Sequence, residues 1–164
     1  MVNHYSFFKT ESDDGIDYLF FTDKGRIYTV SFDTSIYENL DAKFPTLLEF
    51  GYGIIFKFDQ SLPKEKGKDY KDTNVHSTIV AIVQDFLENS ENETFIIYEC
   101  PDYKQSKLFC NWVDGDEHSN IYQYGFEVQI EGTNDHAYFG FITDKNNPLI
   151  TDAVSELEMF FTSL

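Results

Sequence analysis

The side chains of this chain that could act as nucleophiles or bases are few, with two cysteines and four histidines in 164 residues. A thiol nucleophile needs a neighbouring base to take its proton. Cys100 ends an apolar run of strand length, a position that can line an active site. A small-molecule-binding protein or hydrolase would therefore use Cys100, His76 and Trp112, in a pocket between the sheet and the helix that carries Trp112. The competing interpretation is a buried, inert thiol, the common state of a free cysteine.

Possible metal ligands gather in two acidic loops. Asp116, Glu117 and His118 are consecutive, and Asp135 precedes His136 at a predicted hairpin turn. If the two loops approached each other, they could bind a divalent cation. However, the chain has no HExxH motif and no pair of histidines at metal-ligand spacing, so solvated loops are favoured and no metal or cofactor is predicted. The phosphate-binding loops and the GxSxG elbow are absent as well, and we assign no catalytic residue.

Charge is the strongest signal in the sequence. Twenty-nine acidic residues oppose twelve basic ones, which gives a net charge of -17. Repulsion disfavours direct binding to nucleic acid or to an anionic membrane, whereas a basic protein surface is complementary. The sequence therefore favours a non-catalytic interaction domain, of the antitoxin, immunity or inhibitor kind, that covers a basic partner surface. The contact candidates are Asp114, Asp116, Glu117, Glu127 and Glu131.

The location expected from the sequence is the cytoplasm. The longest apolar runs are far shorter than the roughly 18 residues that span a bilayer. The first residues lack both the basic head and the apolar stretch of a secretory signal. Cys100 and Cys110 have neither CxxC spacing nor a disulfide framework.

Aromatic residues make up 18% of the chain, which predicts a folded domain with an aromatic core. Period-two alternation and turn residues such as Gly25 predict four strands in the first third of the chain. Between residues 36 and 50 the pattern is ambiguous, because Pro45 interrupts any helix. The four predicted strands are Tyr5–Phe8, Ile16–Thr22, Arg26–Phe32 and Gly51–Phe58.

The remaining chain alternates helical and strand patterns. The clearest is the helix Thr73–Asn89, with its apolar stripe Val75, Ile79, Ile82, Val83 and Phe86. The others are a strand at Thr94–Cys100, a short helix at Tyr103–Val113, a hairpin at Tyr122–Ile130 and Ala137–Thr143, and a last helix opened by Pro148. On the hairpin, Tyr122, Tyr124, Phe126 and Tyr138 form either an aromatic stacking platform or a face buried under helices.

These elements predict one α+β domain over residues 1–164. Short turns between neighbouring strands imply antiparallel pairing. We therefore expect a mainly antiparallel, curved sheet with about three helices packed on it. The predicted order is roughly β-β-β-β-α-β-α-β-β-α, and the oligomeric state is left open.

Four short motifs together resemble a family of small bacterial proteins, of a type common in Bacteroidota, that is catalogued as a domain of unknown function. The motifs are Thr22-x-x-Gly25-x-x-Tyr28-x-Val30-x-Phe32, Thr78-Ile79-x-x-Ile82-x-x-Phe86, Ile97-Tyr98-x-Cys100 and Lys104-Gln105-x-Lys107-x-Phe109-x-x-Trp112. The resemblance implies a standalone cytoplasmic domain and no particular activity. In the family the last motif carries arginines where this chain has Lys104 and Lys107, and lysine cannot replace a bidentate arginine.

Overall fold

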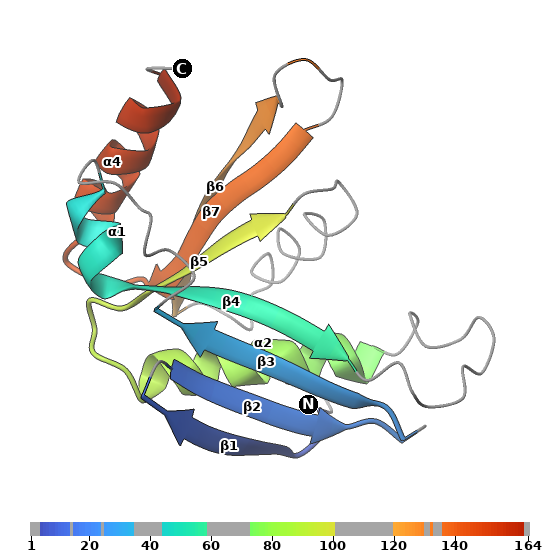
Figure 1. Cartoon of the computed structure of the whole chain (residues 1–164). Coiled ribbons are helices and arrows are strands. Elements are labelled where there is room, and N and C mark those ends of the chain that lie inside the picture. Colours follow the sequence, from blue (N-terminus) through green and yellow to red (C-terminus); the bar gives the residue numbers. More distant parts are fainter. Residues whose placement is uncertain are drawn as a thin grey trace. The chain divides into compact units, whose positions relative to one another are not determined.

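The computed structural model describes residues 4–13, 15–23, 25–34, 44–58, 73–100, 120–129, 132 and 136–162. Seven strands are hydrogen-bonded in the order β1-β2-β3-β4-β5-β7-β6, mostly antiparallel, and the α+β prediction is confirmed (Figure 1). The strands are β1 (Phe7–Ser12), β2 (Gly15–Phe21), β3 (Ile27–Asp33), β4 (Gly51–Phe58), β5 (Phe95–Cys100), β6 (Ile121–Gln129) and β7 (His136–Asp144). The helices in this part of the chain are α1 (Pro45–Phe50), α2 (Thr73–Glu88) and α4 (Ile150–Thr162). The helix predicted at Tyr103–Val113 lies outside the described residues.

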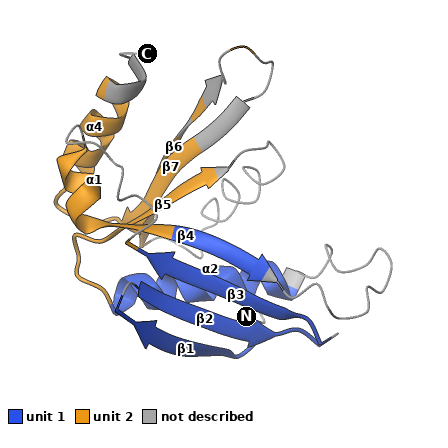
Figure 2. Cartoon of the chain, in the orientation of Figure 1, with its two compact units in different colours: residues 1–33, 54–89 blue, residues 34–53, 90–164 orange. Residues whose placement is uncertain are grey.

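The chain divides into two compact units (Figure 2). The first comprises residues 1–33 and 54–89, and the second comprises residues 34–53 and 90–164. Both units take part of β4: its first three residues belong to the second unit and the rest to the first. The prediction of a single domain over the whole chain stays a prediction.

In the first unit, β1, β2 and β3 form an antiparallel meander. Leu19 lies opposite Phe8 on one side and opposite Thr29 on the other. The turn between β2 and β3 depends on Gly25, whose φ of 80° is easily reached only without a Cβ. The amide of Gly25 donates to the carbonyl oxygen of Thr22 at 2.9 Å, and the Thr22 hydroxyl accepts from the amide of Arg26 at 3.1 Å.

Helix α2 covers one face of this meander, as its apolar stripe predicts. Ile82, Val83 and Phe86 are buried, and the ring of Phe86 stacks on that of Phe32 with centroids 4.0 Å apart. A buried threonine ties the helix to the chain before β1: the Thr78 hydroxyl accepts from the amide of Tyr5 at 2.8 Å and donates to the carbonyl oxygen of Asn74. The face of the meander that bears even-numbered β2 and β3 residues is therefore the core face of this unit.

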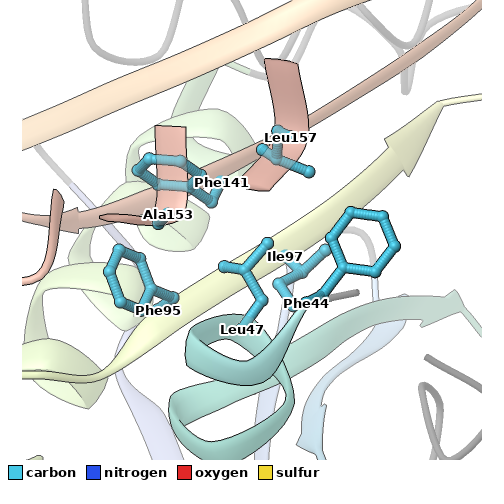
Figure 3. Packing of buried hydrophobic residues seen from close by; sticks show 7 residues of the cluster. All are labelled: Phe44, Leu47, Phe95, Ile97, Phe141, Ala153 and Leu157. Carbon is cyan, nitrogen blue, oxygen red and sulfur yellow. The ribbon is translucent and has the colours of Figure 1, made fainter. Parts of the chain in front are cut away.

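In the second unit, the start of β4 pairs with β5 in parallel, and β5, β7 and β6 pair antiparallel. Helices α1 and α4 contribute to one apolar cluster with β5 and β7 (Figure 3). The rings of Phe95 and Phe141 meet edge to face with centroids 5.0 Å apart. The buried members of the cluster are Phe44, Leu47, Phe95, Ile97, Phe141, Ala153 and Leu157.

Helix α1 shows where the sequence analysis was wrong. We expected Pro45 to interrupt a helix, but it begins one, because the first turn of a helix needs no amide donor. Phe44, at the N-cap, makes no side-chain capping bond. Glu156 of α4 does so instead: its carboxylate accepts from the amides of Thr46 at 2.9 Å and Leu47 at 3.4 Å. A partner 110 residues away in sequence leaves no local signal for the start of this helix.

Candidate functional site

One of the five predicted partner-contact residues can be placed. Glu127 is exposed on β6. The other four, Asp114, Asp116, Glu117 and Glu131, lie outside the described residues. The proposed contact surface on the second unit therefore stays a prediction.

The alternative pocket rested on Cys100, His76 and Trp112. Cys100 is the last residue of β5, in the second unit, whereas His76 is half-buried on α2, in the first. Trp112 lies outside the described residues. Within the described ranges, no group of three His, Cys, Asp or Glu side chains is arranged to hold a metal ion. A thiol nucleophile and a small-molecule pocket both stay predictions.

The aromatic residues of the hairpin do not share one face. Tyr122 and Tyr124 pack against the core cluster of the second unit, as a face buried under helices requires. Tyr138 lies opposite Glu127, whereas its neighbour Phe139 lies opposite Phe126. Since successive residues of a strand point to opposite faces, Tyr138 belongs to the other face. A stacking platform of all four aromatic residues is excluded by this register.

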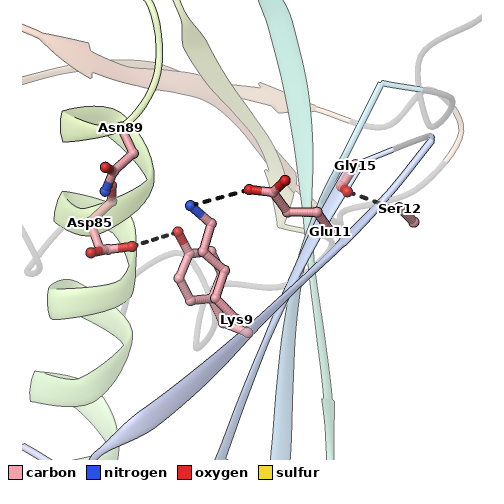
Figure 4. Close-up of polar contacts among 7 residues, drawn as sticks. Lys9, Glu11, Ser12, Gly15, Asp85 and Asn89 are labelled. Atoms are coloured by element: carbon pink, nitrogen blue, oxygen red, sulfur yellow. Dashed lines mark hydrogen bonds and ion pairs between the residues drawn. The ribbon is translucent and has the colours of Figure 1, made fainter.

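A buried tyrosine links the meander to α2 on the core face of the first unit. The Tyr18 hydroxyl donates to Asp85 Oδ2 at 2.7 Å, and the backbone carbonyl oxygen of Asp85 accepts from the side chain of Asn89 at 2.8 Å. Figure 4 shows Asp85 and Asn89 on the helix. Burial, followed by the hydrogen bond and the charge of Asp85, raises the pKa of Tyr18 well above its ordinary value. Tyr18 therefore remains a neutral donor at physiological pH, and its hydrogen bond to Asp85 links β2 to α2.

The opposite face of the meander, which we call the open face, carries large exposed aromatic side chains. It is formed by even-numbered β1 residues and odd-numbered β2 and β3 residues, because Phe8 pairs with Leu19 and Leu19 with Thr29. Phe8 is 61% exposed and Phe21 46% exposed, and their rings meet edge to face with centroids 6.4 Å apart. Leu19 is half-buried between them and β3.

The open face changes character along the strands. Its apolar end consists of Phe8, Leu19, Phe21 and Ile27. Thr29 lies opposite Leu19, and the residues that follow on the same face toward the β1–β2 turn are polar as well: Thr10, Asp17, Ser31 and Asp33. Asp17 is exposed, and Asp13 in the adjoining turn is exposed too. The described residues of β1–β3 thus place an apolar end and a carboxylate end, in which Asp17 and Asp33 lie near hydroxyl side chains, on one surface.

Sequence reasoning missed this surface because β2 is apolar on both faces. Tyr18 and Phe20 alternate with Leu19 and Phe21, so the period-two pattern does not distinguish the buried face from the exposed one. The one polar residue in the middle of the strand, Asp17, was the available signal.

Comparison with known proteins adds no relative: no protein-family model matches the chain, and no curated protein or solved structure matches it either. The resemblance to the Bacteroidota family therefore stays a prediction. Among the described residues, no helix has the length and apolar character that crossing a membrane requires.

Proposed function

We propose that this protein is a non-catalytic interaction domain that covers a basic surface of a partner protein, in the manner of an antitoxin, an immunity protein or an inhibitor. The observation that carries the proposal is the net charge of -17, with 29 acidic residues against 12 basic ones. A strongly negative surface attracts a basic partner over distances of the order of 10 Å and speeds association.

The described carboxylates support this proposal because many are exposed, and they lie on both units. In the first unit they include Glu11, Asp13, Asp17 and Asp23. In the second they include Glu91, Glu99, Glu127, Asp152 and Glu158. The free-energy cost of removing water from an exposed carboxylate is offset only when a cation takes the place of the water. Exposed carboxylates therefore favour a basic partner over an apolar one.

The test is affinity capture from native host lysate with the tagged protein, at about 50 mM and about 150 mM NaCl, followed by mass spectrometry. We expect one basic protein to be retained at the higher salt. An unrelated tagged protein of similar size and pI is the control for nonspecific retention of basic proteins. Retention of no specific protein at either salt would contradict the proposal.

Association kinetics provide a second readout. If charge steers the encounter, the association rate constant for the captured partner falls steeply as salt rises, while the dissociation rate constant changes little. Stopped-flow or surface plasmon resonance over a salt series measures both constants. A salt-independent association rate would mean that the negative charge does not serve partner binding.

A further inference from the structure

We propose that the open face of β1–β3 is the docking surface for a basic amphipathic helix of the partner protein. This inference rests on the proposed function and adds to it the surface and the chemistry of the segment that the surface takes. It is drawn wholly within the first unit.

The apolar end of the open face supplies the anchor points. Phe8 of β1 and Phe21 of β2 expose 61% and 46% of their surface, although β2 buries Tyr18 and Phe20 completely on its other face. The two exposed rings contact each other and flank Leu19. Aromatic side chains that become buried on association are the usual anchors of protein interfaces.

The carboxylate end sets the sign of the partner's charge. Asp17 lies on the same face as Phe21, four residues earlier in β2, and Asp33 lies opposite Gly15 at the same end of the sheet. At about 3.3 Å per residue, Phe21 and Asp17 are about 13 Å apart along the strand. An anionic membrane or a nucleic acid would be repelled here, whereas lysine or arginine side chains would be attracted.

The distance between the apolar end and the carboxylate end determines how apolar and basic residues should be spaced on the partner helix. A helix that lies along the strands rises about 1.5 Å per residue, so about 13 Å corresponds to roughly nine residues. The partner helix should therefore carry an apolar stripe in one half and lysine or arginine on the same stripe two to three turns away. Hydroxyl side chains accompany both ends: Thr29 lies opposite Leu19, and Thr10 and Ser31 lie opposite Asp17.

The experiment uses the full chain, labelled with ¹⁵N, and a synthetic helical peptide with leucines in the first half of one stripe and lysines in the second half. A peptide of the same composition in scrambled order is the control for charge alone. We expect the amide shifts to change at Thr10, Leu19 and Phe21, and the scrambled peptide to bind at least about tenfold more weakly.

Paired variants locate the surface. Phe8→Ser should weaken peptide binding about tenfold, because the part of the ring that is exposed in the free protein would be buried only in the complex. Asp17→Lys should weaken it several-fold, most at low salt. The matched controls, Met159→Ser at a side chain that is 73% exposed and Glu49→Lys at an exposed position of α1, lie in the second unit and should leave the affinity unchanged.

The outcomes separate this inference from the proposed function. Shifts elsewhere, or wild-type affinity in both Phe8→Ser and Asp17→Lys, would overturn the docking surface. A peptide that does not bind, together with a basic partner captured equally by wild type and by both variants, would overturn the surface and leave the proposed function in place. If the peptide does not bind and no basic partner is captured, both the docking surface and the proposed function are overturned. Circular dichroism checks that each variant is folded.

Discussion

At the scale of single residues, carboxylates on the helices accept hydrogen bonds from neutral donors. Asp85 accepts from the Tyr18 hydroxyl, Glu158 from the Tyr124 hydroxyl, both at 2.7 Å, and Glu156 from backbone amides. Because the chain has only twelve basic residues for 29 acidic ones, few cationic side chains are available to pair with these carboxylates. Hydrogen bonds to a charged acceptor are stronger than neutral ones, so these contacts fix where α2 and α4 lie within their own units.

Tyr18→Phe should show the value of one such bond. The ring and its packing are kept, but the half-buried Asp85 carboxylate loses its donor. We expect the free energy of unfolding to fall by about 1.5 kcal/mol, as measured by urea denaturation. Asp85→Asn in the same background should recover part of the loss, because it removes the unpaired charge. An unchanged stability in Tyr18→Phe would mean that water replaces the hydroxyl without cost.

The hydrogen bond of Tyr124 should make the stability of the protein depend on pH in the alkaline range. Burial and the hydrogen bond to Glu158 raise the pKa of Tyr124 to about 12. A raised pKa means that the folded state holds the proton more tightly, so the contribution to stability is complete below about pH 10 and is lost as pH rises toward 12. Urea denaturation should therefore show a gap between wild type and Tyr124→Phe that narrows above about pH 10. A gap that is constant with pH would contradict this assignment.

At the scale of elements, helix α1 depends on α4 for its first turn. It has six residues, no acidic residue in its first turn and no local capping side chain, so Glu156 supplies its N-terminal acceptors. Glu156→Ala should lower the free energy of unfolding by about 1 kcal/mol and speed hydrogen exchange at the amides of Thr46 and Leu47. Ser155→Ala, at the exposed neighbouring position, is the control and should change neither. Unaltered exchange in Glu156→Ala would show that the helix start is fixed by packing of Leu47 alone.

Strands β5, β6 and β7 depend on two glycines beneath Tyr98. Tyr98 lies opposite Gly140, which lies opposite Gly125, and the Tyr98 hydroxyl accepts from Gln123 Nε2 at 2.9 Å. A Cβ at position 140 would lie 2.6 Å from the Tyr98 hydroxyl and 2.7 Å from the Cα of Gly125, and would overlap the carbonyl oxygen of Tyr124. The ring therefore fills the space that the two missing side chains leave.

Gly140→Ala should for this reason destabilise the protein by about 3 kcal/mol, because backbone atoms of the adjacent strand cannot move aside. Gly132→Ala is the matched control: its Cβ meets nothing within 4 Å, and only the φ of 82° opposes it, at a cost of about 1 kcal/mol. Thermal denaturation of both variants measures the difference. Equal effects would mean that the strands separate easily at Gly140.

The sequence predicted those elements whose pattern is local. The stripe of α2 and the alternation of β3 were sufficient for their positions to within one or two residues. Edge strand β1 was placed too early, at Tyr5–Phe8 instead of Phe7–Ser12, because its exposed residues carry no apolar pattern. The start of α1 depends on Glu156, and the open face depends on which side of β2 the helix covers. The start of α1 and the covered side of β2 are both determined by tertiary contacts, so neither can be recognised in a short window of sequence.

At the scale of the whole molecule, the excess of negative charge should make salt stabilising. Compact folding brings like charges together, and added ions screen their repulsion. The exposed Lys9–Glu11 ion pair, at 3.7 Å, is the kind that contributes little and so offsets little of this repulsion (Figure 4). We expect the Tm to rise by several degrees between about 20 mM and about 500 mM NaCl, as measured by calorimetry.

A charge-reduced variant separates repulsion from other effects of salt on stability. Asp17→Asn, Glu91→Gln and Glu127→Gln combined remove three exposed charges without changing side-chain shape. If repulsion dominates, the variant has a higher Tm than wild type at low salt, and its Tm rises less steeply with NaCl. If instead its salt dependence equals that of wild type, salt acts through apolar burial or another bulk effect. A Tm that falls with salt in wild type would show that local ion pairs outweigh the net charge of -17.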